Sequence, residues 1–310
     1  MAAAPLRSSR SATSPDHRHI VLVPGLQGML REAARVPRLV RRLLGRGESR
    51  ALDPATCHSS LLFDCDFPAA ALSRHLDRPD DTLGSWMRAD PVGVTPDLGA
   101  VWLHGQARLS SNSPAARDLA ALFSEEGMRL DLVGSDRGYL ALERVPDCRF
   151  APPWQLAGES MDRVWPQGPE ALYWRRLLNE TQMILHQHRQ LDSELPGSLW
   201  FWGAGELPVT APVARVRRIR AVSPEPLGAA AWAGLDVVET AESEVDARPG
   251  ALVEWQPDHA MTAEDNLERL AAYLALALRR LRFDRHLREL ELACEQRVWR
   301  LSTLRAWRPW

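Results

Sequence analysis

Residues 168–203, GPEALYWRRLLNETQMILHQHRQLDSELPGSLWFWG, constrain the fold most, because a long helical pattern leads into an aromatic strand pattern. At about 100° per residue, one broad apolar stripe forms on the helix. Its members are Trp174, Leu177, Leu178, Ile184 and Leu185. Pro169 and Glu170 suit a first helical turn, where the N–H that proline lacks is unpaired in any case. The segment therefore predicts a long helix, a short loop and a strand over residues 198–202.

A row of polar and basic side chains lies beside this apolar stripe. It consists of Arg175, Asn179, Gln182 and His186, each three or four positions from the next. Amides next to a buried face need hydrogen-bond partners. The row therefore either holds neighbouring backbone or faces a ligand at the edge of a cleft. His186 and His188 point to different sides of a helix, so we do not expect them to chelate a metal.

The strand LWFWG places Trp200 and Trp202 on one face and Phe201 on the other. Aromatic side chains on both faces are typical of a central strand that is covered on both sides. The alternative is that they line a binding cleft.

Strand and helix patterns alternate along the chain. Strands are expected over residues 19–23, 100–103, 198–202, 251–255 and 290–294, the last being the final strand. Helices are expected over residues 31–44, 115–126 and 262–282, and a hairpin is expected where residues 130–133 and 139–143 flank GSDRG. This order predicts an α/β fold, a mainly parallel sheet with flanking helices, plus a smaller α+β portion that contains the hairpin. We expect a disordered tail over residues 1–18 and a single domain over residues 19–310, with a sub-domain around residues 98–165.

Composition excludes several function classes. The formal net charge is −2, so no overall positive field attracts nucleic acid or an anionic membrane. All 38 basic residues are arginine, which is typical of a GC-rich bacterial genome and excludes Schiff-base and Walker-lysine chemistry. The four cysteines form no CxxC pair, there is no secretory h-region, and no apolar run is long enough to span a membrane. These features predict a cytoplasmic protein with reduced thiols.

Several segments resemble one known family. The central run GESMDRVWPQGPEALYWRRLLNETQMILHQH, followed by LPGSLWFWGAGELP, is similar to the proteobacterial Rpf-type regulatory proteins. RADPVGVTPD, VLVPGLQG and LSTLRAWRPW resemble further segments of that family. Many of its members are labelled phosphoglycerate-mutase-like, which implies kinship with cofactor-independent phosphoglycerate mutases and the alkaline phosphatase superfamily. Gly93 stands where the family has a histidine after Asp-Pro-Val.

The resemblance implies a site with two divalent metals, Mn²⁺ or Mg²⁺, and a serine nucleophile. Such enzymes carry an aspartate directly after the first strand, but Pro24 and Gly25 stand there. The nucleophile candidates are Ser59 and Ser60, beside His58. The metal-ligand candidates are Asp64, Asp66, Asp258 and His259, with His104 as a further imidazole. Asp64 and Asp66 would share one face if FDCDF were a strand. Each of these residues equally suits a turn or a helix start.

A hydrolase interpretation competes with the metal enzyme. VLVPGLQG resembles the turn that supplies an oxyanion-hole N–H in α/β-hydrolases, and GSDRG has the outline of a nucleophile elbow with Asp136 as the attacking residue. An elbow requires a helix directly afterwards, whereas YLALERVPDC alternates like a strand. A hairpin turn is therefore favoured over the elbow.

The sequence favours a regulatory or ligand-binding protein without a full two-metal site. The alternatives are a metal-dependent phosphomutase or phosphatase and an α/β-hydrolase-like enzyme. The expected partner is a phosphorylated small molecule or another protein, and neither nucleic acid nor membrane. A cleft is expected at the carboxyl ends of the parallel strands. The ligand-binding candidates are Gly25, Gln27 and Gly28 at its mouth, with Arg175, Asn179 and Gln182 nearby.

Overall fold

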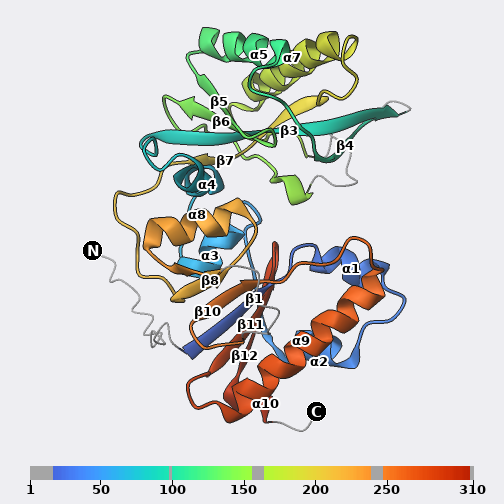
Figure 1. Cartoon of the computed structure of the whole chain (residues 1–310), viewed down its shortest axis with the longest axis vertical. Coiled ribbons are helices and arrows are strands. Elements are labelled where there is room, and N and C mark those ends of the chain that lie inside the picture. Colours follow the sequence, from blue (N-terminus) through green and yellow to red (C-terminus); the bar gives the residue numbers. More distant parts are fainter. Residues whose placement is uncertain (1–16, 98–99, 156–163, 239–246, 308–310) are drawn as a thin grey trace, which may run out of the picture.

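Two β-sheets, one above the other, organise the chain (Figure 1). The computed structural model describes residues 17–97, 100–155, 164–238 and 247–307. Within these residues one sheet has seven strands and the other has five. The predicted fold class is confirmed, because one sheet is mostly parallel with flanking helices and the other is antiparallel.

The seven-stranded sheet is built around a fully buried strand, β1. Its order is β2 (Glu48–Ala51), β12 (Arg297–Ser302), β11 (Glu289–Cys294), β1 (Arg18–Leu22), β10 (Ala251–Glu254), β8 (Arg218–Arg220) and β9 (Asp236–Val237). The pairings of β1 with β10 and β11, of β10 with β8, and of β8 with β9 are parallel. β12 is antiparallel to both β11 and β2. A parallel strand covered on both faces carries consecutive apolar residues, as Ile20, Val21 and Leu22 do after Arg18 and His19 in β1.

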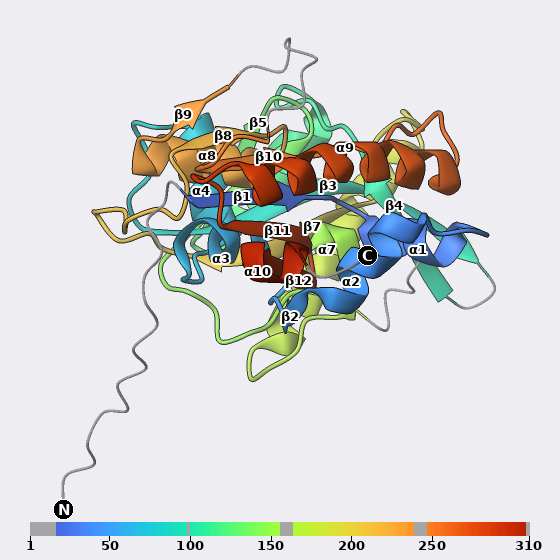
Figure 2. The same cartoon turned by 90° about the horizontal axis from the view of Figure 1, so that it is seen from below.

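Helices cover both faces of this sheet. α1 (Leu26–Glu32), α2 (Arg38–Arg46) and α9 (Ala263–Phe283) pack on the face to which β1 contributes Val21. α9 lies over the sheet roughly along the direction of β1 (Figure 1 and Figure 2). α3 (Cys57–Phe63) and α8 (Pro224–Ala233) pack on the opposite face, to which β1 contributes Ile20. The short helix α10 (Thr303–Ala306) follows β12.

The five-stranded sheet lies above the first and is antiparallel. Its order is β4 (Ala100–Gln106), β3 (Ser85–Asp97), β6 (Arg137–Leu142) and β5 (Arg129–Val133), with β7 (Ser198–Gly205) also paired to β3. α5 (Pro114–Glu125) and α7 (Ala171–Arg189) share a core with this sheet, and η2 (Pro153–Gln155) is a single turn between β6 and α7. α4 (Ala69–Asp77) lies with α8 between the two sheets (Figure 1).

The aromatic strand β7 is buried on both faces, as predicted, but it is not a central strand, because among the described residues it pairs with β3 alone. The ring of Phe201 packs edge-on against Trp174 at 5.5 Å and Phe123 at 5.9 Å. Trp202 packs against Trp154 at 5.1 Å between ring centroids. Trp200 is also buried, and its indole N–H donates to the Ala151 carbonyl at 2.7 Å. These rings form core rather than a cleft.

Several predicted elements are confirmed with small shifts in their bounds. The helices over residues 115–126 and 262–282 appear as α5 and α9, each capped by a hydroxyl, from Ser113 and Thr262 respectively. The hairpin of β5 and β6 is antiparallel, with the GSDRG turn between its strands. The strands predicted over residues 19–23, 100–103, 198–202 and 251–255 correspond to β1, β4, β7 and β10.

Other predictions about elements were wrong. The helix over residues 31–44 is two helices, α1 and α2, separated by residues 33–37, which end in a proline that cannot continue a helix. The strand over residues 290–294 is not the last one, because β12 follows it. FDCDF is not a strand but the end of α3 and a loop. Residues 1–16 of the predicted tail lie outside the described part, and Arg18 already belongs to β1. The sub-domain around residues 98–165 stays a prediction, and the upper sheet takes its strands from the wider range Ser85 to Gly205.

The contact between α4 and α8 depends on a glycine. A Cβ atom on Gly228 would lie 1.9 Å from the Leu72 carbonyl oxygen and 2.6 Å from its carbon. Gly228→Ala must therefore move a backbone, and we expect it to lower the free energy of unfolding by about 1–3 kcal/mol or more.

Gly45→Ala in α2 is the matched control, because nothing lies within 4 Å of the added Cβ. Alanine is the better helix former, so this variant should gain about 0.5–1 kcal/mol. Urea unfolding of both variants measures the difference. If Gly228→Ala and Gly45→Ala changed the free energy of unfolding in the same direction, the close packing of α8 on α4 would be contradicted.

Candidate functional site

The turn after β1 lies at the carboxyl edge of the parallel sheet, as predicted. Gly25 has a φ of 70° and its N–H donates to a Glu295 carboxylate oxygen at 2.7 Å. The Gln27 amide contacts the Cys294 sulfur at 3.8 Å. Gly28 lies inside α1 with open space around its Cα. The Gly25 N–H is therefore already bonded within the protein and does not present an oxyanion hole.

The acidic candidates of the FDCDF segment are bound to nearby protein groups. Asp64 ends α3 in the left-handed conformation, and its carboxylate lies 3.1 Å from the Arg215 guanidinium. Asp66 accepts hydrogen bonds from the Thr56 hydroxyl at 3.0 Å and from the Ser60 hydroxyl. Because this segment is not a strand, the two carboxylates do not share a strand face as expected. The Asp64 carboxylate pairs α3 with the segment before β8, and the Asp66 carboxylate holds the loop after α3 against that helix.

The serine candidates are buried in the same region. The Ser59 hydroxyl donates to the carbonyls of Thr56 and Phe67 and accepts from the Phe67 N–H at 2.7 Å. The Ser60 hydroxyl donates to Asp66. Each hydroxyl fixes the loop that follows α3, so neither is arranged as an exposed nucleophile beside an imidazole.

Asp258 and His259 begin the approach to α9. The Asp258 N–H donates to the Asn266 amide oxygen at 2.8 Å, and the Asp258 carboxylate accepts from the Ala260 N–H at 2.9 Å. His259 is exposed. Across the described ranges, no three His, Cys, Asp or Glu side chains gather closely enough to hold a metal. His104 is one of the residues whose side chain is not described.

The hydrolase interpretation fails at its central motif. GSDRG is the turn between β5 and β6, and β6 is a strand where an elbow needs a helix. The Asp136 carboxylate lies 3.7 Å from the neighbouring Arg137 guanidinium. Asp136 is therefore a turn residue.

The polar row on α7 borders a groove of about 720 Å³. Asn179, Gln182 and His186 line it, together with Arg189, which lies three positions after His186. The remaining lining residues are Val94, Met183, Gln190, Ser193 and Gly197. Three of the four side chains of the row thus border a cavity, which lies elsewhere than the cleft expected at the parallel strands.

Arg175, the first member of the predicted row, does not belong to the groove. Its guanidinium donates to the Pro166 carbonyl at 3.1 Å and lies 5.7 Å from the Trp165 ring. Arg175 therefore holds the backbone of the segment before α7, which is the first of the two roles that the sequence allows for the row. Gly25, Gln27 and Gly28 are also absent from the groove, because they lie on the parallel sheet while α7 packs on the antiparallel one. The expectation of one shared cleft was therefore wrong.

The groove side chains retain hydrogen-bonding capacity. Within the part of the chain that the structure describes, the side chains of Asn179, His186 and Arg189 make no hydrogen bond or ion pair. The Gln182 amide contacts the Ser198 hydroxyl at 3.4 Å. Met183 adds an apolar side chain that is 63% exposed. The groove thus combines amide donors and acceptors, two basic groups and an apolar wall.

Gly197 shapes the floor of the groove. A Cβ atom at this position would lie 2.1 Å from a Val94 methyl group. The Gly197 N–H donates to the Val92 carbonyl at 3.0 Å, which ties the loop before β7 to β3. The loop can therefore follow β3 closely, and the groove lies between this junction and α7.

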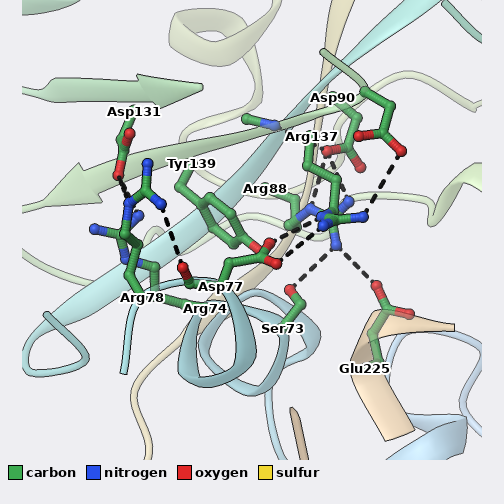
Figure 3. Close-up of polar contacts among 12 residues, drawn as sticks. Ser73, Arg74, Asp77, Arg78, Arg88, Asp90, Asp131, Arg137, Tyr139 and Glu225 are labelled. Carbon is green, nitrogen blue, oxygen red and sulfur yellow. Dashed lines mark hydrogen bonds and ion pairs between the residues drawn. The ribbon is translucent and has the colours of Figure 1, made fainter. Parts of the chain in front are cut away.

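The RADPVGV segment, in contrast, carries a buried charge cluster (Figure 3). The Arg88 guanidinium donates to Asp90 at 2.9 Å, Glu225 at 2.8 Å and the Ser73 hydroxyl at 3.1 Å. Asp90 also accepts from the Trp202 indole N–H at 2.7 Å. Burial opposes the charge on Arg88, but Asp90 and Glu225 outweigh it and raise the pKa of the guanidinium. Burial raises the pKa of the Asp90 carboxyl despite the pull of Arg88.

This cluster joins the upper sheet to α4 and α8, the two helices that lie between the sheets. Ser73 belongs to α4, Glu225 to α8, Arg88 and Asp90 to β3, and Trp202 to β7. Nearby, Asp77 accepts from the Tyr139 hydroxyl at 2.6 Å and pairs with Arg137 at 2.8 Å. The polar atoms satisfy one another, so we assign the cluster a structural role.

The comparisons with known proteins gave structural likenesses only. The structure is similar to the cofactor-independent phosphoglycerate mutase from Thermoplasma acidophilum DSM 1728, with a TM-score of 0.41 and 18% identity over 93% of this chain and 89% of that one. It is also similar to the PH0037 protein from Pyrococcus horikoshii, with a TM-score of 0.45 and 11% identity over 94% of this chain and 88% of that one. No protein-family model and no curated protein matches the sequence. The likenesses assign no activity to this chain.

In the ranges that the structure covers, the helices are too short or too polar to cross a bilayer.

Proposed function

We propose that this chain binds a small organic anion, and that the groove beside α7 is the binding site. The observation that supports the proposal is the coincidence of the predicted polar row with a cavity of about 720 Å³. Cavities of roughly 300–1,000 Å³ with a few convergent polar groups are the usual form of small-molecule sites.

The charges of the lining favour an anion. Among the described residues that line the groove, the ionisable side chains are the bases His186 and Arg189, and none is acidic. A guanidinium matches the geometry of phosphate and carboxylate groups, which it binds with two parallel hydrogen bonds. Asn179 and Gln182 can orient hydroxyl or carbonyl groups of the ligand. Met183 and Val94 suit an apolar portion of the same molecule.

The lining supports recognition rather than metal-dependent phosphoryl transfer. Divalent cations of that chemistry need oxygen ligands from carboxylates. The acidic candidates Asp64, Asp66 and Asp258 lie elsewhere and hold protein groups. A phosphorylated small molecule therefore fits the proposal as a ligand. The Rpf-type regulatory family and a cytoplasmic location belong to the same proposal and rest on the sequence segments alone.

Arg189→Ala should weaken binding of 3-phosphoglycerate by about ten-fold or more, because a charge-assisted hydrogen bond is worth about 1.5–3 kcal/mol. Calorimetric titration of the full chain measures the affinity. Arg176→Ala is the control on the same helix, since that guanidinium pairs with Glu126 and is absent from the groove.

The uncharged analogue glycerol should not bind. Gln182→Ala should also weaken the binding of 3-phosphoglycerate, because this amide lines the groove too. Unchanged affinity in both Arg189→Ala and Gln182→Ala would contradict the assigned site.

A further inference from the structure

A second cavity lies where the parallel sheet changes the direction of its connections. The chain leaves β8 into α8 on one face of the sheet and leaves β10 into α9 on the opposite face. β8 and β10 are hydrogen-bonded neighbours. Adjacent parallel strands whose connections diverge in this way open a crevice at their carboxyl ends, which is where open α/β sheets bind ligands.

A cavity of about 590 Å³ occupies this crevice. Arg220 from the end of β8, Trp255 and Gln256 after β10, and Arg269 and Tyr273 from α9 are among its lining residues. The crevice therefore joins two guanidinium groups and two aromatic rings from three separate elements.

The two guanidinium groups differ in their surroundings. Arg220 is half-buried, and its guanidinium makes no hydrogen bond or ion pair with any residue in the described ranges. The Arg269 guanidinium lies 5.5 Å from the Trp255 ring centroid and donates to the Asn266 amide oxygen at 3.3 Å. A half-buried cation without a protein partner favours an anionic ligand.

The carboxylate in the crevice is already occupied. Glu254 is buried and accepts from the backbone N–H groups of Val222 at 2.7 Å and Ser223 at 2.9 Å. It also accepts from the Gln256 amide at 2.8 Å. Because these donors offset its charge, Glu254 leaves Arg220 and Arg269 available to an anion.

We propose that this crevice binds a mononucleotide-type ligand, with its phosphate at Arg220 and Arg269 and its base against Trp255. Guanidinium groups recognise phosphate, and a base stacks on an aromatic side chain regardless of its identity. The proposal is independent of the α7 groove, which lies against the other sheet and shares no lining residue with the crevice.

Titration of the full chain with AMP, followed by calorimetry, tests this site. Arg220→Ala and Trp255→Ala should each lower the affinity for AMP by at least ten-fold. The control Arg279→Ala changes an exposed arginine of α9 outside the crevice and should leave the affinity for AMP unchanged. Arg189→Ala in the α7 groove should also leave it unchanged, so the two sites are distinguished.

Adenosine and inorganic phosphate, titrated separately, should each bind more weakly than AMP. Unfolding curves of both crevice variants report whether they fold. If Arg220→Ala does not fold, the AMP affinity of Trp255→Ala tests the site. Absence of AMP binding, or AMP binding unchanged by the crevice variants, would overturn the proposal, as would phosphate that binds as tightly as AMP.

Discussion

Arg88→Met should lower the free energy of unfolding by about 3–5 kcal/mol, because it leaves buried carboxylates without their cation. Asp90 and Glu225 are both buried and both bind the Arg88 guanidinium directly. Urea unfolding near neutral pH measures the loss.

The penalty of Arg88→Met should shrink in acid. Burial already raises the pKa of Asp90 in the folded protein, and removal of the guanidinium raises it further. A carboxyl whose folded pKa exceeds its unfolded value destabilises the fold above that pKa. The difference from the parent protein should therefore be largest at neutral pH and decrease as the pH falls through the raised pKa.

Arg78→Met is the matched control. Its side chain is 45% exposed and lies 3.5 Å from Asp131, so its loss should cost at most about 1 kcal/mol. If Arg78→Met and Arg88→Met lowered the free energy of unfolding equally, the buried cluster would not hold the upper sheet to α8.

Trp200→Ala should also cost about 3–5 kcal/mol, through a large cavity in the upper core. The indole is buried within the core shared with α5 and α7, and its N–H donates to the Ala151 carbonyl. Truncation removes the ring and leaves that carbonyl without this donor.

Trp102→Ala on β4 provides the comparison, because that side chain is 36% exposed. Its loss should cost far less by the same unfolding measurement. If the two tryptophan variants lost equal stability, β7 would not be the doubly covered strand that the sequence and the structure both indicate.

Local patterns predicted much of this fold. β1 reads as a short apolar run, α9 carries a hydroxyl cap at Thr262, and GSDRG separates two alternating strands. Each of these signals is contained within about ten neighbouring residues. The split between α1 and α2 was missed because the apolar and arginine spacing continues past the proline that separates them.

Elements stabilised by distant partners were missed. β3 carries prolines and charged residues, and its Arg88 and Asp90 are tolerated only because Glu225 and Trp202 surround them. β12 forms by pairing with β2 and β11 rather than through an apolar run. Such contacts join residues far apart in the chain, so no local spacing reveals them.

The candidate site was predicted only in part. Helical spacing identified Asn179, Gln182 and His186 as one row, and the same spacing extended by three residues would have included Arg189. Val94 lies on β3, and sequence offers no signal that brings it next to α7. The metal candidates are not brought together among the described residues. An acidic residue in a loop caps turns as readily as it binds a cation, so its sequence position alone does not distinguish the two roles.

A crystal structure of the full chain with 3-phosphoglycerate and Mn²⁺ tests the central claim most directly. The α7 groove should hold the ligand with its anionic group beside Arg189 and its neutral part toward Met183. Paired Mn²⁺ ions bound by Asp64, Asp66, Asp258 or His259, with the phosphate over them and the groove empty, would contradict an anion-binding role for the groove.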